Sequence, residues 1–177
     1  MIFLQAAVYI VLPLYPLLIL IPTTTSDHST TMEDIAAKHA PLISSLHKLY
    51  NTLVAMRYIS PSEVLNPPHS TETIPDDTLQ PLGYEPETIQ LIRLIPFLRG
   101  DVAWGFQNNG TEILPRSQAI SYAIERDTDW IEYLRWGDEF MSPNHRLLHP
   151  WMIRLTIGRM YPGQYGADLI YDTRTRR

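Results

Sequence analysis

Four carboxylates lie close together in the second half of the chain, among aromatic residues. They are Glu125, Asp127, Asp129 and Glu132, and the aromatic residues are Trp130, Tyr133 and Trp136. Glycoside hydrolysis needs two carboxylates at a suitable separation, and aromatic rings offer platforms for a sugar. Asp127, Asp129 and Glu132 are therefore candidate catalytic residues of a small hydrolase. The alternative is that these carboxylates cap helices and face water.

A histidine pair is the second candidate for chemistry. His145 and His149 are four positions apart, so on a helix both imidazoles would share one face, as in many metal sites. Asp138 and Glu139 lie nearby as potential third ligands. The pair lacks the glutamate that hydrolytic zinc sites place after the first histidine, and prolines flank it on both sides. Two loop histidines without a metal are the competing interpretation.

The stretch Asn109-Gly110-Thr111 fits two patterns. It is a glycosylation acceptor if the domain reaches the secretory lumen. Asn-Gly also favours a two-residue hairpin turn, which requires no particular compartment. We therefore expect a turn at this position, with sugar on Asn109 only in a secreted protein.

Composition excludes several classes of protein. The 177 residues are 45% hydrophobic with a net charge of −5, which fits a folded domain and argues against nucleic-acid binding. The absence of cysteine excludes disulfides, thiol catalysis and cysteine-ligated metals. The sequence also lacks a GxSxG elbow, a phosphate-binding glycine loop and a dinucleotide fingerprint. We therefore expect no cofactor.

The chain begins with an apolar segment, residues 1–22. No charged side chain precedes Asp27, and the run 2–21 is long enough, as a helix, to cross a bilayer. Pro13 and Pro16 interrupt it, and the residues before Asp27 form a poor cleavage site. We favour a membrane anchor slightly over a cleaved signal; without either, the protein is cytoplasmic. Residues 23–31 read as a linker, and 32–177 as a single domain.

Helical patterns dominate the first half of this domain. Thr30 with Glu33, or Thr31 with Asp34, predicts a helix start, and Ser60 with Glu63 predicts another. Between them, apolar residues recur at helical spacing at Leu42, Leu46, Leu49, Leu53 and Met56. Residues 66–81 read as a proline-rich loop. A buried helix begins at Glu85-Pro86-Glu87, and the helical spacing continues to Leu98 with Pro96 bending or stopping the helix.

Alternating patterns follow. Residues 102–106 and 111–114 predict a hairpin around Asn109-Gly110, with Pro115 placing its second strand at an edge. Residues 119–133 are compatible with a helix. Residues 151–157 and 167–172 predict a second hairpin around Pro162-Gly163. Helices followed by hairpins, without βαβ alternation, indicate an α+β fold with helices packed on a small antiparallel sheet.

Three stretches carry a resemblance to uncharacterised proteins of filamentous fungi. They are Ile95-Pro96-Phe97-Leu98, Trp104-Gly105 with Ile113-Leu114-Pro115-Arg116-Ser117, and Pro150-Trp151 through Ile170-Tyr171-Asp172-Thr173. This resemblance implies no activity. A buried helix before a strand pair that ends at Gly166-Ala167-Asp168-Leu169-Ile170-Tyr171-Asp172 is also similar to the SUKH-type domain of cell-wall regulators and immunity proteins. That similarity implies a protein-interaction module on an α+β fold.

Three functional hypotheses follow. The leading one is a non-enzymatic interaction or scaffold module with an unknown protein partner, tethered to or routed through a membrane by residues 2–21. The second is a small hydrolase that uses the acidic cluster or the histidine pair. The third is a secreted effector-like protein, cleaved near Ser26 and glycosylated on Asn109.

Overall fold

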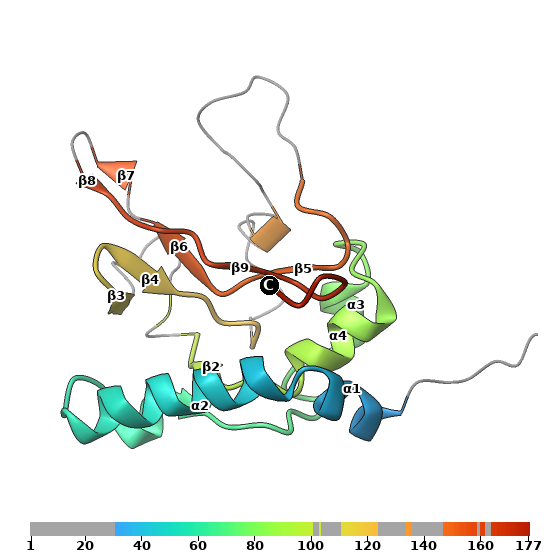
Figure 1. Cartoon of the computed structure of the whole chain (residues 1–177), viewed down its shortest axis with the longest axis horizontal. Helices are drawn as coiled ribbons and strands as arrows, with labels where there is room; N and C mark the ends of the chain where they lie inside the picture. The colour runs from blue at the N-terminus through green and yellow to red at the C-terminus, as the bar shows by residue number, and fades with distance from the viewer. Residues whose placement is uncertain are drawn as a thin grey trace, which may run out of the picture.

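A computed structural model of the chain describes residues 31–100, 103, 111–123, 134–135, 147–158, 160–161 and 164–177. The apolar segment 1–22 and nearly all of the linker 23–31 lie outside these ranges, as does the predicted strand 102–106 except for Ala103. Within them the fold is α+β, as the sequence predicts: short helices and small antiparallel sheets (Figure 1).

Two helices open the described chain. α1 (Met32–Lys38) begins at a capping box in which Thr31 accepts from the backbone of Asp34 and the Asp34 carboxylate accepts from the backbone of Thr31. α2 (Ala40–Ala55) follows after His39, which caps both helices. A proline is accommodated in the first turn of a helix, so Pro41 opens α2 rather than kinking it. The predicted amphipathic helix is confirmed, with Leu46 and Tyr50 buried on its inner side.

A second helical group packs against α1. After the short 3₁₀ turn η1 (Pro61–Glu63), which is capped by Ser60 as predicted, the chain enters the region read as a loop. One helical turn, α3 (Asp76–Leu79), lies within it, which corrects the prediction for residues 66–81. α4 (Pro86–Ile92) begins where the Glu85-Pro86-Glu87 signal predicts and buries Ile89, Leu91 and Ile92.

The helical prediction is wrong beyond Ile92. The chain leaves α4 there, and Phe97–Leu98 form β2, paired antiparallel with β1 (Val64–Leu65). A residue before proline is disfavoured in the α-helical region, so Pro96 ends the helix and lets the following residues extend. Phe97 and Leu98 are both buried, and a fully apolar run of this kind carries no period that separates strand from helix.

The central sheet has the order β3-β4-β6. β3 (Glu112–Leu114) is the strand expected at 111–114, but it pairs with β4 (Ser117–Ala119) across a turn at Pro115 and Arg116. Arg116 supplies the left-handed backbone of this turn with a φ of 58°. The predicted helix 119–133 is therefore wrong at its start, since Ala119 is in β4 and 120–123 are not helical; residues 124–133 lie outside the described ranges. β4 then pairs with β6 (Thr156–Gly158).

The C-terminal hairpin is confirmed, in two paired parts. β5 (Met152–Arg154) pairs antiparallel with β9 (Ile170–Asp172). β7 (Met160–Tyr161) pairs with β8 (Gln164–Tyr165) and forms the protruding tip visible in Figure 1. Between the two parts, β6 leaves the hairpin to join β4, so the single strand expected at 151–157 is split at Leu155.

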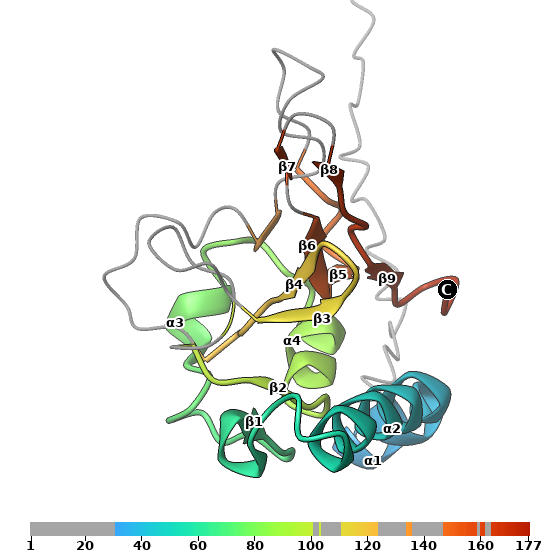
Figure 2. The same ribbon diagram turned by 90° about the vertical axis from the view of Figure 1, so that its left-hand side faces the viewer.

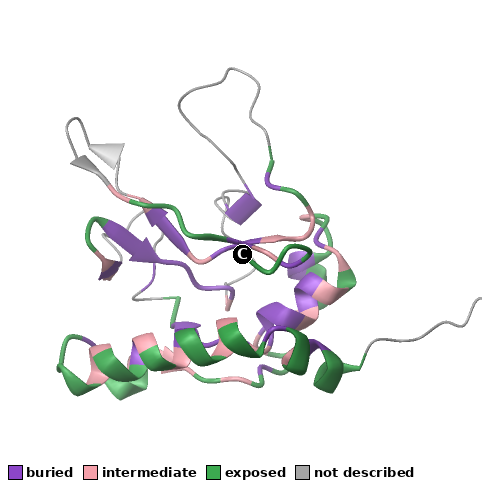
Figure 3. Cartoon of the chain, viewed as in Figure 1, coloured by how far each residue is buried: buried purple, intermediate pink, exposed green. Residues whose placement is uncertain are grey.

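β3, β4, β5, β6 and β9 lie above α1 and α2, with α4 beside them, whereas β1 and β2 lie at the level of α2 (Figures 1 and 2). Figure 3 shows β4 and β6 buried and the outward side of α2 exposed. The larger of two buried clusters joins α4 to the strands through residues such as Leu91, Phe97, Tyr122 and Ile153. Among the described residues, no helix has both the length and the apolar character needed to cross a bilayer.

Candidate functional site

Most candidate residues from the sequence lie outside the described part of the chain. This holds for Asp127, Asp129, Glu132, His145 and Asn109, so the acidic cluster, the metal pair and the glycosylation site remain predictions. Only His149 is described. Within the described ranges, no group of three histidine or carboxylate side chains could hold a metal ion.

His149 stacks on an aromatic ring. Its imidazole lies parallel to the Trp151 indole, with centroids 4.4 Å apart and 3° between the planes. The Arg174 guanidinium carbon lies 3.5 Å from the centroid of the same indole, and this side chain also pairs with Glu85 at 2.6 Å. A cation over a tryptophan face is favourable. This group therefore fastens the end of the chain to the N-terminus of α4.

A buried polar chain connects three distant parts of the fold. His39 is fully buried; its Nδ1 lies 2.9 Å from the Tyr171 hydroxyl and its Nε2 3.1 Å from the Glu87 carboxylate. Lys38 also donates to Glu87, at 2.5 Å. An ionised carboxylate only accepts, so Nε2 carries a proton; in the neutral imidazole, Nδ1 then accepts from the Tyr171 hydroxyl.

The pKa values of Glu87 and Tyr171 are shifted by their surroundings. Partial burial acts to raise the pKa of Glu87, but the hydrogen bonds and charges of Lys38 and His39 outweigh it and hold the pKa below its usual value. Burial raises the pKa of Tyr171 above its usual value. A tyrosine, a histidine and a carboxylate in series resemble a nucleophile, base and orienting group. The His39 imidazole, however, is fully buried and both of its nitrogens face protein partners. We therefore assign these hydrogen bonds a structural role, since they connect the α1–α2 junction to α4 and β9.

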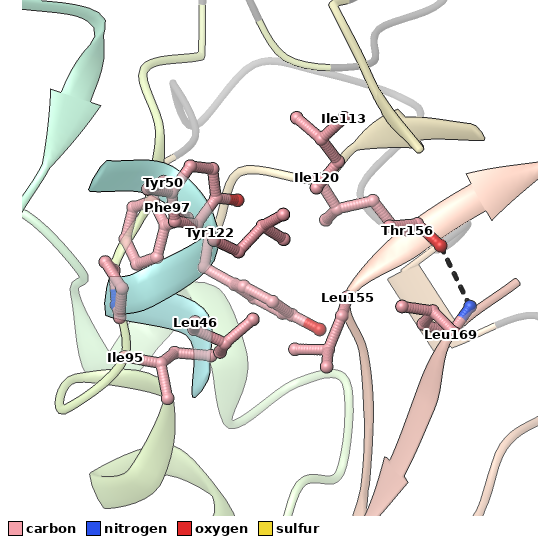
Figure 4. A pocket seen from close by; sticks show the side chains of 12 residues that line it. Leu46, Tyr50, Ile95, Phe97, Ile113, Ile120, Tyr122, Leu155, Thr156 and Leu169 are labelled. Atoms are coloured by element: carbon pink, nitrogen blue, oxygen red, sulfur yellow. Dashed lines mark hydrogen bonds between the residues drawn. The ribbon is translucent and has the colours of Figure 1, made fainter. Parts of the chain in front are cut away.

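An apolar slot lies between α2 and the strands (Figure 4). One wall comes from α2 through Leu46, Leu49 and Tyr50, and the segment before β2 adds a second wall. The full lining is Leu46, Leu49, Tyr50, Ile95, Pro96, Phe97, Ile113, Ile120, Tyr122, Leu155, Thr156 and Leu169. Leu49 and Leu155 are half-buried, and Leu169 is 39% exposed, so these three leucines reach the surface. We call this set the α2 slot.

The Tyr122 and Thr156 hydroxyls that line the α2 slot have protein partners. The Tyr122 hydroxyl donates to Arg154 C=O, and the Thr156 hydroxyl donates to Ala167 C=O while it accepts from Leu169 N–H, the bond drawn in Figure 4. Complete burial raises the pKa of Tyr122 well above its usual value, so this side chain stays a neutral phenol. The slot therefore offers a partner mainly apolar surface.

The volume of the α2 slot limits what it can hold. The cavity measures about 20 Å³, whereas pockets for drug-sized ligands measure roughly 300–1,000 Å³. An apolar space of this size, comparable with about one water molecule, also binds water poorly because water needs polar partners. The tip of one aliphatic side chain is the chemical group that fits.

Segment 166–169 contributes Leu169 to the slot lining and is held by side-chain bonds to β4 and β6. Ser117 accepts from Ala167 N–H, and Asp168 accepts from Gly158 N–H and pairs with the buried Arg154 at 3.3 Å. Gly158 and Gly166 permit a close approach, because a Cβ on Gly166 would lie 1.8 Å from the Arg116 carbonyl oxygen. Leu169 is held in place by this network.

Sequence reasoning missed both the slot and the buried chain. The slot residues come from separate parts of the sequence, and each looks like an ordinary core residue. His39 carried one available signal, a histidine two residues before Pro41 in the predicted helical stretch. Its partners Glu87 and Tyr171 are 48 and 132 positions away, so no local pattern marks them.

Comparison with known proteins finds no matching family model, no similar curated sequence and no similar solved structure. The chemistry of the described residues is therefore the basis for a functional proposal.

Proposed function

We propose that this chain is a non-enzymatic interaction module that takes an aliphatic side chain of a protein partner into the α2 slot. The observation that carries the proposal is the slot itself: apolar walls around about 20 Å³, with Leu169 exposed at its edge. Binding hot spots are apolar or aromatic anchors that fill small pockets and lose water on binding. The similarity to SUKH-type domains, which are interaction modules, is in line with this proposal.

The described polar groups support the interaction module over the hydrolase. A hydrolase needs a catalytic group that can reach its substrate. The His39 side chain is fully buried, Tyr171 is only 8% exposed, and the His149 ring stacks on Trp151. The Leu49, Leu155 and Leu169 side chains at the slot edge are, in contrast, open to a partner.

We also propose that residues 2–21 tether the module to a membrane, or route it into the secretory pathway. The support is the uncharged apolar run before Asp27. In the secretory case the mature chain would begin near Ser26 and carry sugar on Asn109. Mass spectrometry of protein exported from cells distinguishes the two routes.

Site-directed photo-crosslinking tests the interaction module. A photoreactive side chain at Leu169 should capture one recurrent partner in cells, and the same side chain at Leu147 should not, because Leu147 is 55% exposed but outside the slot lining. The affinity of the captured partner for purified variants of this chain is then measured. Leu169→Glu should weaken its binding at least about tenfold, or about 1.4 kcal/mol, while Leu147→Glu binds like the parent chain.

Thermal melts of both variants show whether they remain folded. Equal capture from Leu169 and Leu147, or equal affinity of the two glutamate variants, would show that the α2 slot is not the binding site. Turnover of a glycoside or ester by the purified chain would favour the hydrolase instead.

A further inference from the structure

The outer edge of β9 is covered by the chain's own last residues. In the ladder with β5, Leu155 N–H donates to Leu169 C=O and Thr173 N–H donates to Trp151 C=O. Backbone groups alternate between the two sides of a strand, so those of Ile170 and Asp172 point away from β5. There, Asp172 N–H donates to Arg177 C=O at 2.8 Å, and Asp172 C=O accepts from Arg176 N–H at 2.7 Å.

We call residues 174–177 the strap. The Asp172 carboxylate accepts from the backbone N–H of Arg174 and Thr175, which turns the chain back along β9. Arg176 completes the turn in the left-handed region, with a φ of 60°. Arg174 then anchors the strap on Trp151 and Glu85. Figure 2 shows the strap at the outer rim of the molecule, beyond β9.

The contacts that hold the strap are exposed. The Arg174 side chain is 56% accessible and its partner Glu85 36%, and exposed ion pairs contribute roughly 0–1 kcal/mol. An exposed cation–π contact adds about 0.5–1 kcal/mol. The strap can therefore open without loss of the buried core, since local opening needs far less free energy than global unfolding.

The edge beneath the strap is complementary to itself. If two copies of β9 run antiparallel about a two-fold axis at Tyr171, Ile170 of each copy lies opposite Asp172 of the other. Their outward N–H and C=O groups then pair directly, and the two Asp172 carboxylates do not face each other. Leu169 and Ile170 are 39% and 36% exposed, so apolar surface lies next to this edge. An uncovered strand edge is a template for such pairing.

We propose that the strap is an autoinhibitory contact that prevents β9 from pairing with β9 of a second copy of this chain. Release of the strap frees the outward N–H and C=O groups of Asp172 beside the exposed Ile170, and two copies join through a continuous four-stranded ribbon, β5-β9-β9-β5. The proposal is independent of the α2 slot.

The test compares the mass of the full chain, purified in one detergent, with that of two variants. One variant stops after Thr173, and the other carries Arg174→Glu, which places a negative charge beside Glu85 and Trp151. We expect the parent chain to be monomeric and both variants to double in mass by native mass spectrometry. If the shortened chain fails to fold, as judged by circular dichroism, the mass of the Arg174→Glu variant alone tests the proposal.

A matched control identifies the edge. Proline at position 170 removes an N–H that points away from β5, so Ile170→Pro blocks the new pairing and leaves the β5 ladder intact. Added to either variant, it should restore the monomer. The proposal is overturned if the folded variants stay monomeric up to their solubility limit, if the parent chain is equally dimeric, or if the dimer persists with Ile170→Pro.

Discussion

Glu87 is the residue on which two parts of the fold meet. Its carboxylate accepts from Lys38 at the end of α1 and from His39 between α1 and α2, while His39 contacts Tyr171 of β9. Lys38 is 39% accessible and its bond is partly screened, whereas His39 is fully buried. The Lys38 bond nevertheless joins two charged groups and is the shorter of the two, and it lowers the pKa of Glu87 more than the His39 bond does.

The depressed pKa of Glu87 predicts a pH dependence of stability. A carboxyl group whose pKa is lower in the folded state stabilises the fold above its unfolded value, here 4.5, and this contribution disappears as the pH falls through the folded value. We expect Glu87→Gln to be less stable than the parent chain at neutral pH, and the difference to shrink below about pH 4.5. Urea denaturation across this range measures it.

Glu72→Gln is the control for this experiment, because Glu72 is an exposed carboxylate. The free energy of unfolding of Glu72→Gln should change with pH in the same way as that of the parent chain. If the free energies of unfolding of Glu87→Gln and the parent chain differ by the same amount at every pH, the predicted pH dependence is wrong.

At the scale of elements, local signals located the helix starts well. The sequence offered two capping registers for α1, Thr30 with Glu33 and Thr31 with Asp34, and the structure selects the second. Thr31→Ala should therefore reduce the free energy of unfolding by about 1 kcal/mol, because the Thr31 hydroxyl no longer accepts from Asp34 N–H or donates to the Asp34 carboxylate. Thr30→Ala is the matched comparison and should change it by less than about 0.5 kcal/mol. Thermal denaturation of both variants distinguishes the registers, and a larger loss from Thr30→Ala would contradict the assignment.

Strands were predicted less well, because their partners are distant in the sequence. Residues 119–123 are compatible with a helix by spacing, but Ala119 pairs with Thr156 of β6 and Ile120 N–H donates to Leu155 C=O. The C-terminal hairpin was predictable because its strands are close together and Pro162-Gly163 marks the turn. Local propensity determines the structure of the C-terminal hairpin. At residues 119–123, pairing with a remote strand overrides it.

The loop 66–81 was predicted from its prolines. The prediction missed α3, because contacts with residues distant in the sequence hold this turn. Arg93 at the end of α4 donates to Ile74 C=O and pairs with Asp76 at 2.7 Å. His69 likewise contacts Ile95 C=O and packs on Phe97. These contacts hold the loop against α4, and no residue within the loop signals them.

At the scale of the whole molecule, both the α2 slot and the buried chain form only when distant segments assemble. The slot needs α2, the segment before β2, the central sheet and Leu169 in place at once. The sequence-based candidates, in contrast, were clusters of neighbouring residues, and most of them lie outside the described ranges. A site built by tertiary packing leaves no local pattern, which is why the fold class could be predicted and this site could not.

The N-terminal segment connects the module to its proposed location. Residues 2–21 carry no charge, and twenty residues of helix span about 30 Å, the thickness of a bilayer core. We expect the full chain to sediment with membranes and to resist alkaline carbonate extraction. A chain that starts at Asp27 keeps α1 and its Thr31 cap, so it should fold and move to the supernatant. Recovery of both chains in the supernatant would refute the tether, and recovery of both with membranes would place the membrane contact in the folded domain.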